Sequence, residues 1–127
     1  MKKFFVILFF LPTVFISCHQ ENKKIERVAQ AYLEALANYK VKEAKPYATP
    51  ETCSSTLAVS EQLVSMVDSA YIISDTPAII EIQEIVMESD SIALVKYVKN
   101  TPLKHDMQGE LYMVKRERQW LAQDLIR

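Results

Sequence analysis

Glycine, cysteine and histidine are scarce in this chain of 127 residues, which contains one glycine, two cysteines and two histidines. A glycine-rich loop that cradles phosphate is therefore excluded. The histidines and cysteines stand at no metal-ligand spacing, so no zinc site is expected. The formal net charge is −1, and the chain lacks the basic footprint with which a nucleic-acid-binding protein neutralises phosphates. Composition thus predicts no metal, no cofactor and no nucleic-acid partner.

The N-terminal segment has the pattern of a secretory signal peptide. Lys2 and Lys3 precede an apolar run over residues 4–16, which Pro12 interrupts. This run is shorter than the roughly 20 apolar residues that a membrane-spanning helix needs. We therefore expect residues 1–17 to be removed. Loss of the two lysines takes the net charge from −1 to −3, so the mature chain is mildly acidic.

Polarity changes abruptly at Cys18, directly after this segment. The stretch Phe15-Ile16-Ser17-Cys18 resembles the lipobox of bacterial lipoproteins, in which a small residue precedes a cysteine that receives a diacylglyceryl thioether. Ser17 fits that pattern, whereas Phe15 stands where leucine is usual. The resemblance implies lipidation of Cys18 with palmitate-like chains, each buried CH₂ contributing about 0.8 kcal/mol. It also implies a membrane-anchored protein of the bacterial cell envelope, held by a lipidated tether over residues 18–24. An ordinary signal peptide that is cleaved elsewhere is the alternative.

Lipid on Cys18 would leave Cys53 without a partner for a disulfide. Cys53, Leu57, Ser60 and Val64 recur at helical spacing. Cys53 is therefore predicted to be a small hydrophobic residue on a buried helix face, and a reactive thiol is the alternative.

The first half of the mature chain has helical periodicity. An amphipathic helix is predicted over residues 22–39, with Asn22 as its N-cap. Its apolar face comprises Ile25, Val28, Ala29, Tyr32, Leu33 and Leu36. One or two helical turns follow within residues 39–48 and should end at the proline there. A third helix over residues 50–69 is predicted to begin after Thr49 as N-cap, because proline stands at its first position.

The second half has the composition of β-strands. Strands are predicted over residues 78–89, 90–100, 109–117 and 119–126, with turns at Ser89-Asp90-Ser91 and Glu117-Arg118-Gln119. Within the second strand, one face carries Ala93, Val95 and Tyr97, and the other carries Ile92, Leu94, Lys96 and Val98. Helices followed by antiparallel strands predict an α+β domain over residues 25–127, with the N-terminal helices packed on a curved antiparallel sheet.

This order of elements resembles small bacterial lipoproteins of unknown function whose domain is similar to nuclear transport factor 2, a cystatin-like cone. The family's Y-x-T-P step is matched by Tyr47-Ala48-Thr49-Pro50, and the A-x-V part of its D-x-A-x-V strand by Ala93 and Val95. Its G-x-W-x-V hairpin is matched at Trp120, with Arg118 in place of glycine and Ala122 in place of valine. Some relatives carry a lumazine-binding-like label, but no residue here supports a pteridine-type ligand.

Candidate residues for catalysis are few. His19 lies in the predicted tether. His105 and Asp106 are adjacent, and adjacent side chains of an extended segment point to opposite sides, so they are not expected to form a dyad. Lys115, Arg116 and Arg118 form a basic cluster that Glu117 interrupts, which is typical of a solvated hairpin turn. No catalytic residue is predicted.

Two aromatic residues, Tyr32 and Trp120, are candidates for lining a pocket in the cone. Their rings could form an apolar wall, with the polar hydroxyl or indole N–H at the mouth of the pocket. Core packing is the alternative that we favour. The sequence thus predicts an exported, lipid-anchored module that binds rather than catalyses. Its occupant is a small apolar ligand, or a protein partner or second copy on the sheet face of Ile92, Leu94 and Val98. An acid–base isomerase or dehydratase that uses the cone cavity is the alternative.

Overall fold

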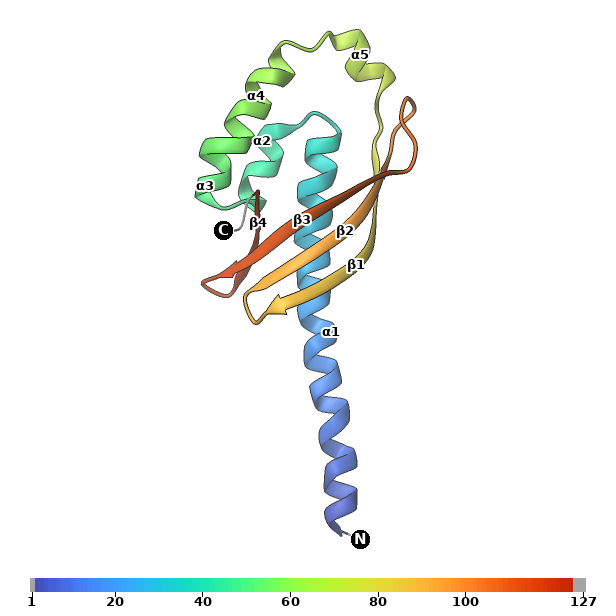
Figure 1. Ribbon diagram of the computed structural model, residues 1–127, viewed down its shortest axis with the longest axis vertical. Helices are drawn as coiled ribbons and strands as arrows, with labels where there is room; N and C mark the ends of the chain where they lie inside the picture. The colour runs from blue at the N-terminus through green and yellow to red at the C-terminus, as the bar shows by residue number, and fades with distance from the viewer. Residues whose placement is uncertain (1, 125–127) are drawn as a thin grey trace.

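The computed structural model describes the backbone of residues 2–124 and the side chains of residues 20–124. A long helix lies across a four-stranded sheet, and shorter helices connect the two (Figure 1). The elements are α1 (Lys2–Ala37), α2 (Val41–Ala44), a 3₁₀ turn (Lys45–Tyr47), α3 (Pro50–Thr52), a π-helical turn (Cys53–Leu57), α4 (Ala58–Ser65), α5 (Ser69–Ser74), β1 (Ile79–Ser89), β2 (Ile92–Asn100), β3 (Met107–Arg116) and β4 (Gln119–Gln123). The predicted α+β class is confirmed.

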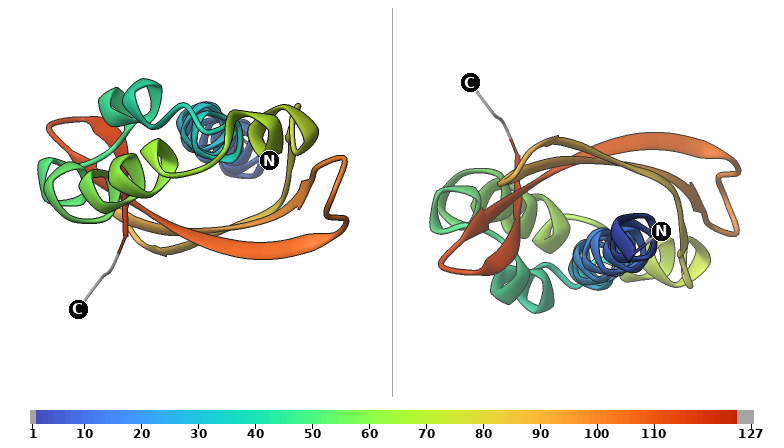
Figure 2. Two further views of the ribbon diagram at one scale, coloured as in Figure 1. Left: turned by 90° about the horizontal axis from the view of Figure 1, so that it is seen from above. Right: turned by 90° about the horizontal axis from the view of Figure 1, so that it is seen from below.

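The four strands form a simple antiparallel meander in the order β1-β2-β3-β4. The sheet curls around α1, so that its concave side faces the helix (Figure 2). The expected turns join β1 to β2 and β3 to β4. The second turn contains Glu117 and Arg118, both with positive φ (51° and 68°), as a two-residue type I′ hairpin turn requires. The predicted fourth strand is shorter than expected and ends at Gln123, and residues 125–127 lie outside the described part.

The core lies between α1 and the concave sheet face. Ala93 and Val95 are fully buried there together with Met113 and Ala122, and Tyr97 packs against them. The predicted division of the second strand into two faces is therefore confirmed: the Ala93 face is inward, and Ile92, Leu94, Lys96 and Val98 lie on the outer face. The described helices all lie on the concave side (Figure 2), so the hydrophobic residues of the outer face remain partly exposed.

The one glycine of the chain has a packing role within the sheet. Gly109 on β3 is directly opposite Tyr97 on β2. A Cβ atom at Gly109 would lie 2.4 Å from Cζ of the Tyr97 ring, which is closer than two non-bonded carbon atoms can approach. The glycine therefore lets the aromatic ring lie flat across the neighbouring strand, in the manner of aromatic side chains that cover glycines in sheets.

The helical connection between α1 and the sheet differs in part from expectation. Thr49 is the predicted N-cap, and its hydroxyl accepts the backbone N–H of Thr52 at 3.2 Å. The short second element turns at Pro46, as expected: α2 ends at Ala44, and a 3₁₀ turn with Pro46 at its second position follows. The expected single helix over residues 50–69 was wrong: its helical stretch ends at Ser65, and a separate helix, α5, begins after Asp68. The Asp68 carboxylate accepts the N–H of Ala70 and caps that helix.

The end of the helical connection also pairs with the sheet. Ala48 forms a parallel bridge with Ala122 of β4, and the N–H of Thr49 donates to the Ala122 carbonyl at 3.0 Å. The backbone edge of β4 that does not pair with β3 is therefore covered at this point.

Helix α1 begins earlier than the sequence pattern predicted. Asn22 is not its N-cap, because the helix already runs from Lys2. The first turns of α1 project beyond the sheet (Figure 1), and the turns β1–β2 and β3–β4 lie at this same end. Among the described residues, no helix is both long and apolar enough to span a membrane. The predicted signal peptide and lipidation at Cys18 stay predictions, since the side chains of residues 1–19 lie outside the described part.

Candidate functional site

The two aromatic residues singled out in the sequence are both buried, each with an exposed fraction of 3%. Tyr32 comes from the inward face of α1, and Trp120 is the second residue of β4; both belong to the core cluster. Trp120 also lines a groove at the edge of the domain, whereas Tyr32 is not among the residues that line it. The side chains of Cys18 and His19 lie outside the described residues.

Trp120 holds the start of the folded domain against the β3–β4 hairpin. Its indole N–H donates to Glu21 Oε2 at 2.7 Å, and Lys115 Nζ lies 3.2 Å from Glu21 Oε1. Lys115 also lies over the Trp120 ring, 5.9 Å from its centroid. The indole hydrogen bond and then Lys115 lower the pKa of Glu21 against the opposing effect of burial. The prediction that Lys115 belongs to a solvated turn was wrong, and Glu21 is a packed residue although it falls in the predicted tether.

Tyr32 lies near a cluster of hydroxyl groups around Asp124. Burial, followed by the nearby charge of Asp124, raises the pKa of Tyr32 to about 12. The Asp124 carboxylate accepts hydrogen bonds from Ser55 Oγ at 2.9 Å and from Thr52 Oγ1 at 3.3 Å, and also from Thr56. These donors come from α3 and the π-helical turn, so the cluster ties the end of the described chain to the helical connection. The hydroxyl cluster therefore has a structural role. Tyr32 stays protonated at neutral pH because its pKa is about 12.

A buried carboxylate forms a separate cluster near the end of α1. Asp75 is 3% exposed and accepts hydrogen bonds from Tyr39 Oη at 2.7 Å and Thr101 Oγ1 at 2.6 Å. The hydrogen bonds from Thr101 and Tyr39 lower the pKa of Asp75, while burial and the same bond raise the pKa of Tyr39. The cluster joins the end of α1, the end of α5 and the β2–β3 loop. Sequence reasoning missed Asp75, because its partners are 36 and 26 residues away.

The outer face of the sheet carries a continuous hydrophobic strip. Val86, Leu94 and Tyr112 lie opposite one another across β1, β2 and β3. Ile92, Val114 and Leu121 form the adjacent row across β2, β3 and β4. We call these six residues the outer strip. All are partly exposed, and Val86 reaches 36%.

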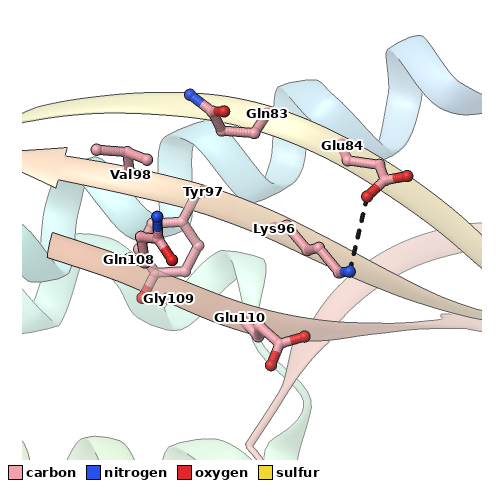
Figure 3. A pocket seen from close by; sticks show the side chains of 8 residues that line it. All are labelled: Gln83, Glu84, Lys96, Tyr97, Val98, Gln108, Gly109 and Glu110. Atoms are coloured by element: carbon pink, nitrogen blue, oxygen red, sulfur yellow. Dashed lines mark ion pairs between the residues drawn. The ribbon is translucent and has the colours of Figure 1, made fainter. Parts of the chain in front are cut away.

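A polar row borders the outer strip. Glu84, Lys96 and Glu110 lie opposite one another on β1, β2 and β3, and Lys96 Nζ is 3.7 Å from Glu84 Oε1. These residues line a shallow depression with a volume of about 670 Å³. Figure 3 shows their side chains on the sheet face turned away from α1, with Val98 farther along the same strand. The sequence identified Ile92, Leu94 and Val98, and the register divides them: Ile92 and Leu94 belong to the strip, whereas Val98 lines the depression.

The remaining sequence candidates do not assemble into a site. Cys53 is partly buried against the core, as predicted, and its Sγ lies 3.5 Å from the Lys45 carbonyl oxygen. His105 and Asp106 are both exposed in the β2–β3 loop. Arg116 pairs with Glu51 at 2.7 Å. Among residues with described side chains, no group of three histidine, cysteine or acidic residues could hold a metal ion.

Comparison with known proteins supports the fold but assigns no activity. No protein-family model matches the chain, and no curated protein matches it. A solved structure that is similar to this chain is that of a protein from Campylobacter jejuni named an NTF2-like transpeptidase. The TM-score is 0.58 at 16% sequence identity, and the alignment covers 76% of this chain and 94% of the other. The likeness shows a nuclear transport factor 2-like fold, and at this identity it carries no activity across.

Proposed function

We propose that this protein is an exported, lipid-anchored binding module that associates with a second copy of itself through the outer strip. The observation that carries the proposal is the continuity of that strip across all four strands. Contiguous hydrophobic surface of this kind usually marks an interface, because exposure to water is unfavourable for each residue in it.

The charges beside the outer strip fit a self-complementary interface. In a two-fold dimer, each residue on one copy meets the equivalent patch on the other. The polar row has the order acid, base, acid, with Lys96 between Glu84 and Glu110. A two-fold axis near the strip can therefore bring Lys96 of one copy toward a carboxylate of its partner without placing like charges together.

The packed interior favours binding at the surface over a ligand inside the cone. Tyr32 and Trp120 fill the space between α1 and the sheet, together with Leu57 and Met113, which are fully buried. An acid–base enzyme of this architecture would need a titratable side chain that faces an open interior. The buried carboxylate of Asp75 instead accepts hydrogen bonds from two protein hydroxyls.

The oligomeric state tests the interface. We expect the full chain, purified in a mild detergent, to show the mass of a dimer by light scattering after correction for bound detergent. Leu94→Lys should give a monomer with an unchanged circular dichroism spectrum, because it places a charge at the centre of the strip. Gln108→Lys is the matched control, since it adds the same charge on the outer face beyond the strip. A parental chain that is monomeric at every concentration would overturn the interface.

Metabolic labelling tests the anchor. Cells that express the full chain should incorporate radioactive palmitate into the protein, and Cys18→Ala should abolish the label. Cys53→Ala is the control, because it removes the other thiol of the chain. Equal labelling of the parental chain and Cys18→Ala, or no labelling of either, would contradict the anchor.

A further inference from the structure

A groove of about 360 Å³ lies between the β3–β4 hairpin and the segment of α1 that contains residues 24–28. We call it the basic groove. Its charged residues are Lys24, Arg27 and Arg118, and no carboxylate is among the residues that line it. Lys24 and Arg27 are three positions apart on α1 and share one helix face. Three cations thus converge from two elements in a chain whose formal net charge is −1.

Two of these cations lack an internal partner. Among the residues with described side chains, Arg27 and Arg118 form no ion pair, whereas the neighbouring cations Lys115 and Arg116 pair with Glu21 and Glu51. The Glu21 carboxylate is also 3.9 Å from Lys24, but its oxygens are engaged by Trp120 and Lys115. The groove therefore presents guanidinium groups whose donors are available to an anion.

Arg118 stands at a backbone position where arginine is unusual. Arg118 has φ of 68° and is the second residue of the hairpin turn. Glycine or asparagine is preferred at this place, because the left-handed conformation costs an ordinary residue about 1–2 kcal/mol. An arginine there is unfavourable for the turn alone, yet it supplies the hairpin's cation to the basic groove.

The other walls of the groove are apolar. Val28 and Leu121 contribute aliphatic surface, and Tyr47, which is 37% exposed, contributes an aromatic ring. Guanidinium groups bind phosphate by paired hydrogen bonds, and apolar walls beside them suit a ligand that carries a hydrocarbon body. The ligand class is therefore a phosphate ester with an apolar part.

The position of the groove selects among such ligands. Lys24 is six residues after Cys18 on the continuous helix α1, a rise of about 9 Å. Arg118 lies in the β3–β4 turn at the same end of the domain (Figure 1). We infer that the basic groove binds the phosphate group of a phospholipid of the bilayer and thereby fixes the orientation of the domain on the membrane. The choice of a bilayer lipid rests on the proposed anchor at Cys18, whereas the phosphate site does not.

Trp120 provides the measurement, because it is the only tryptophan of the chain and lines the groove. The full chain in neutral detergent micelles is titrated with phosphatidylglycerol, with phosphatidylcholine, or with inorganic phosphate against potassium chloride of equal ionic strength. We expect phosphatidylglycerol to shift the Trp120 emission and to raise the thermal unfolding midpoint. Arg118→Gly and Arg27→Gln should each weaken this response about tenfold, the loss expected for one charge-assisted hydrogen bond. Arg118→Gly should remain folded, since glycine favours this φ.

Lys23→Gln is the matched control, because it removes one positive charge from α1 outside the groove. An equal response to inorganic phosphate, with the same order among the variants, would support the site with free phosphate as its source. No change in emission or unfolding midpoint with any probe would overturn the inference, as would equal responses in all variants. Light scattering and palmitate labelling give separate readouts, so failure of the phosphate site is distinguishable from failure of the interface or the anchor.

Discussion

The contact between Gly109 and Tyr97 makes a quantitative prediction about the sheet. In most strand interiors, replacing glycine with alanine stabilises the fold by about 0.5–1 kcal/mol, because glycine loses more conformational freedom on folding. Here the new methyl group would lie 2.4 Å from Tyr97 Cζ. Overpacking of this kind costs about 1–3 kcal/mol. We therefore expect Gly109→Ala to lower the free energy of unfolding by about 1 kcal/mol, the difference between the midpoints of these two ranges.

The same substitution should reverse its sign when the ring is absent. In a Tyr97→Ala background the methyl group meets no aromatic ring, so Gly109→Ala should raise the free energy of unfolding by up to about 1 kcal/mol. The coupling of the two sites, about 1–3 kcal/mol, is within the range that double-mutant cycles measure for residues in contact. Equilibrium denaturation followed by Trp120 emission gives the four values, and Gln108→Ala serves as a neighbouring control. Gly109→Ala with the same effect in both backgrounds would refute this explanation of the glycine.

Two further predictions concern buried polar contacts. Asp75→Ala should lower the free energy of unfolding by roughly 2–4 kcal/mol, because it leaves the hydroxyls of Tyr39 and Thr101 without their charged acceptor. Since the fold lowers the pKa of Asp75, its stabilisation is present above the ordinary aspartate pKa of about 4 and is lost as the pH falls through the folded value. Denaturation between neutral and acidic pH should therefore show a shallower acid limb in Asp75→Asn, and an unchanged limb would count against this assignment. Glu21→Ala should lower the free energy of unfolding by about 1 kcal/mol and shift the Trp120 emission, whereas an unchanged spectrum would show that the indole bond is not formed in solution.

The sheet was predictable because its signals are local. β-Branched and aromatic residues alternate along β1 and β2, and the polar residues between them form the expected turn. Thr49 was predictable as an N-cap for the same reason, since the proline after it begins a helix. Asp68 carried a comparable signal as the N-cap of α5. It was overlooked because the apolar positions on either side continue a helical spacing.

The features that depend on distant contacts could not be predicted in this way. The start of α1 is not marked by Asn22, because the helical pattern continues through that residue and Glu21 meets its partners 94 and 99 residues later. Tyr32 and Trp120 were named as pocket or core residues, and only packing could show how deeply each is buried. The basic groove likewise depends on a hairpin that returns to the first helix. The spacing of the groove's cations in the sequence therefore does not predict the groove.

The bridge between Ala48 and Ala122 has a consequence for how molecules of this protein can join side by side. Sheets that extend from one molecule to the next need two open margins, one to receive a strand and one to offer it. In the described chain, β4 is partly closed by the bridge, and β1 is partly closed at its Ile80 carbonyl, which accepts the side-chain amide of Gln30 at 2.9 Å. Both margins of the sheet are therefore covered at one point each, which works against extension of the sheet from one molecule to the next.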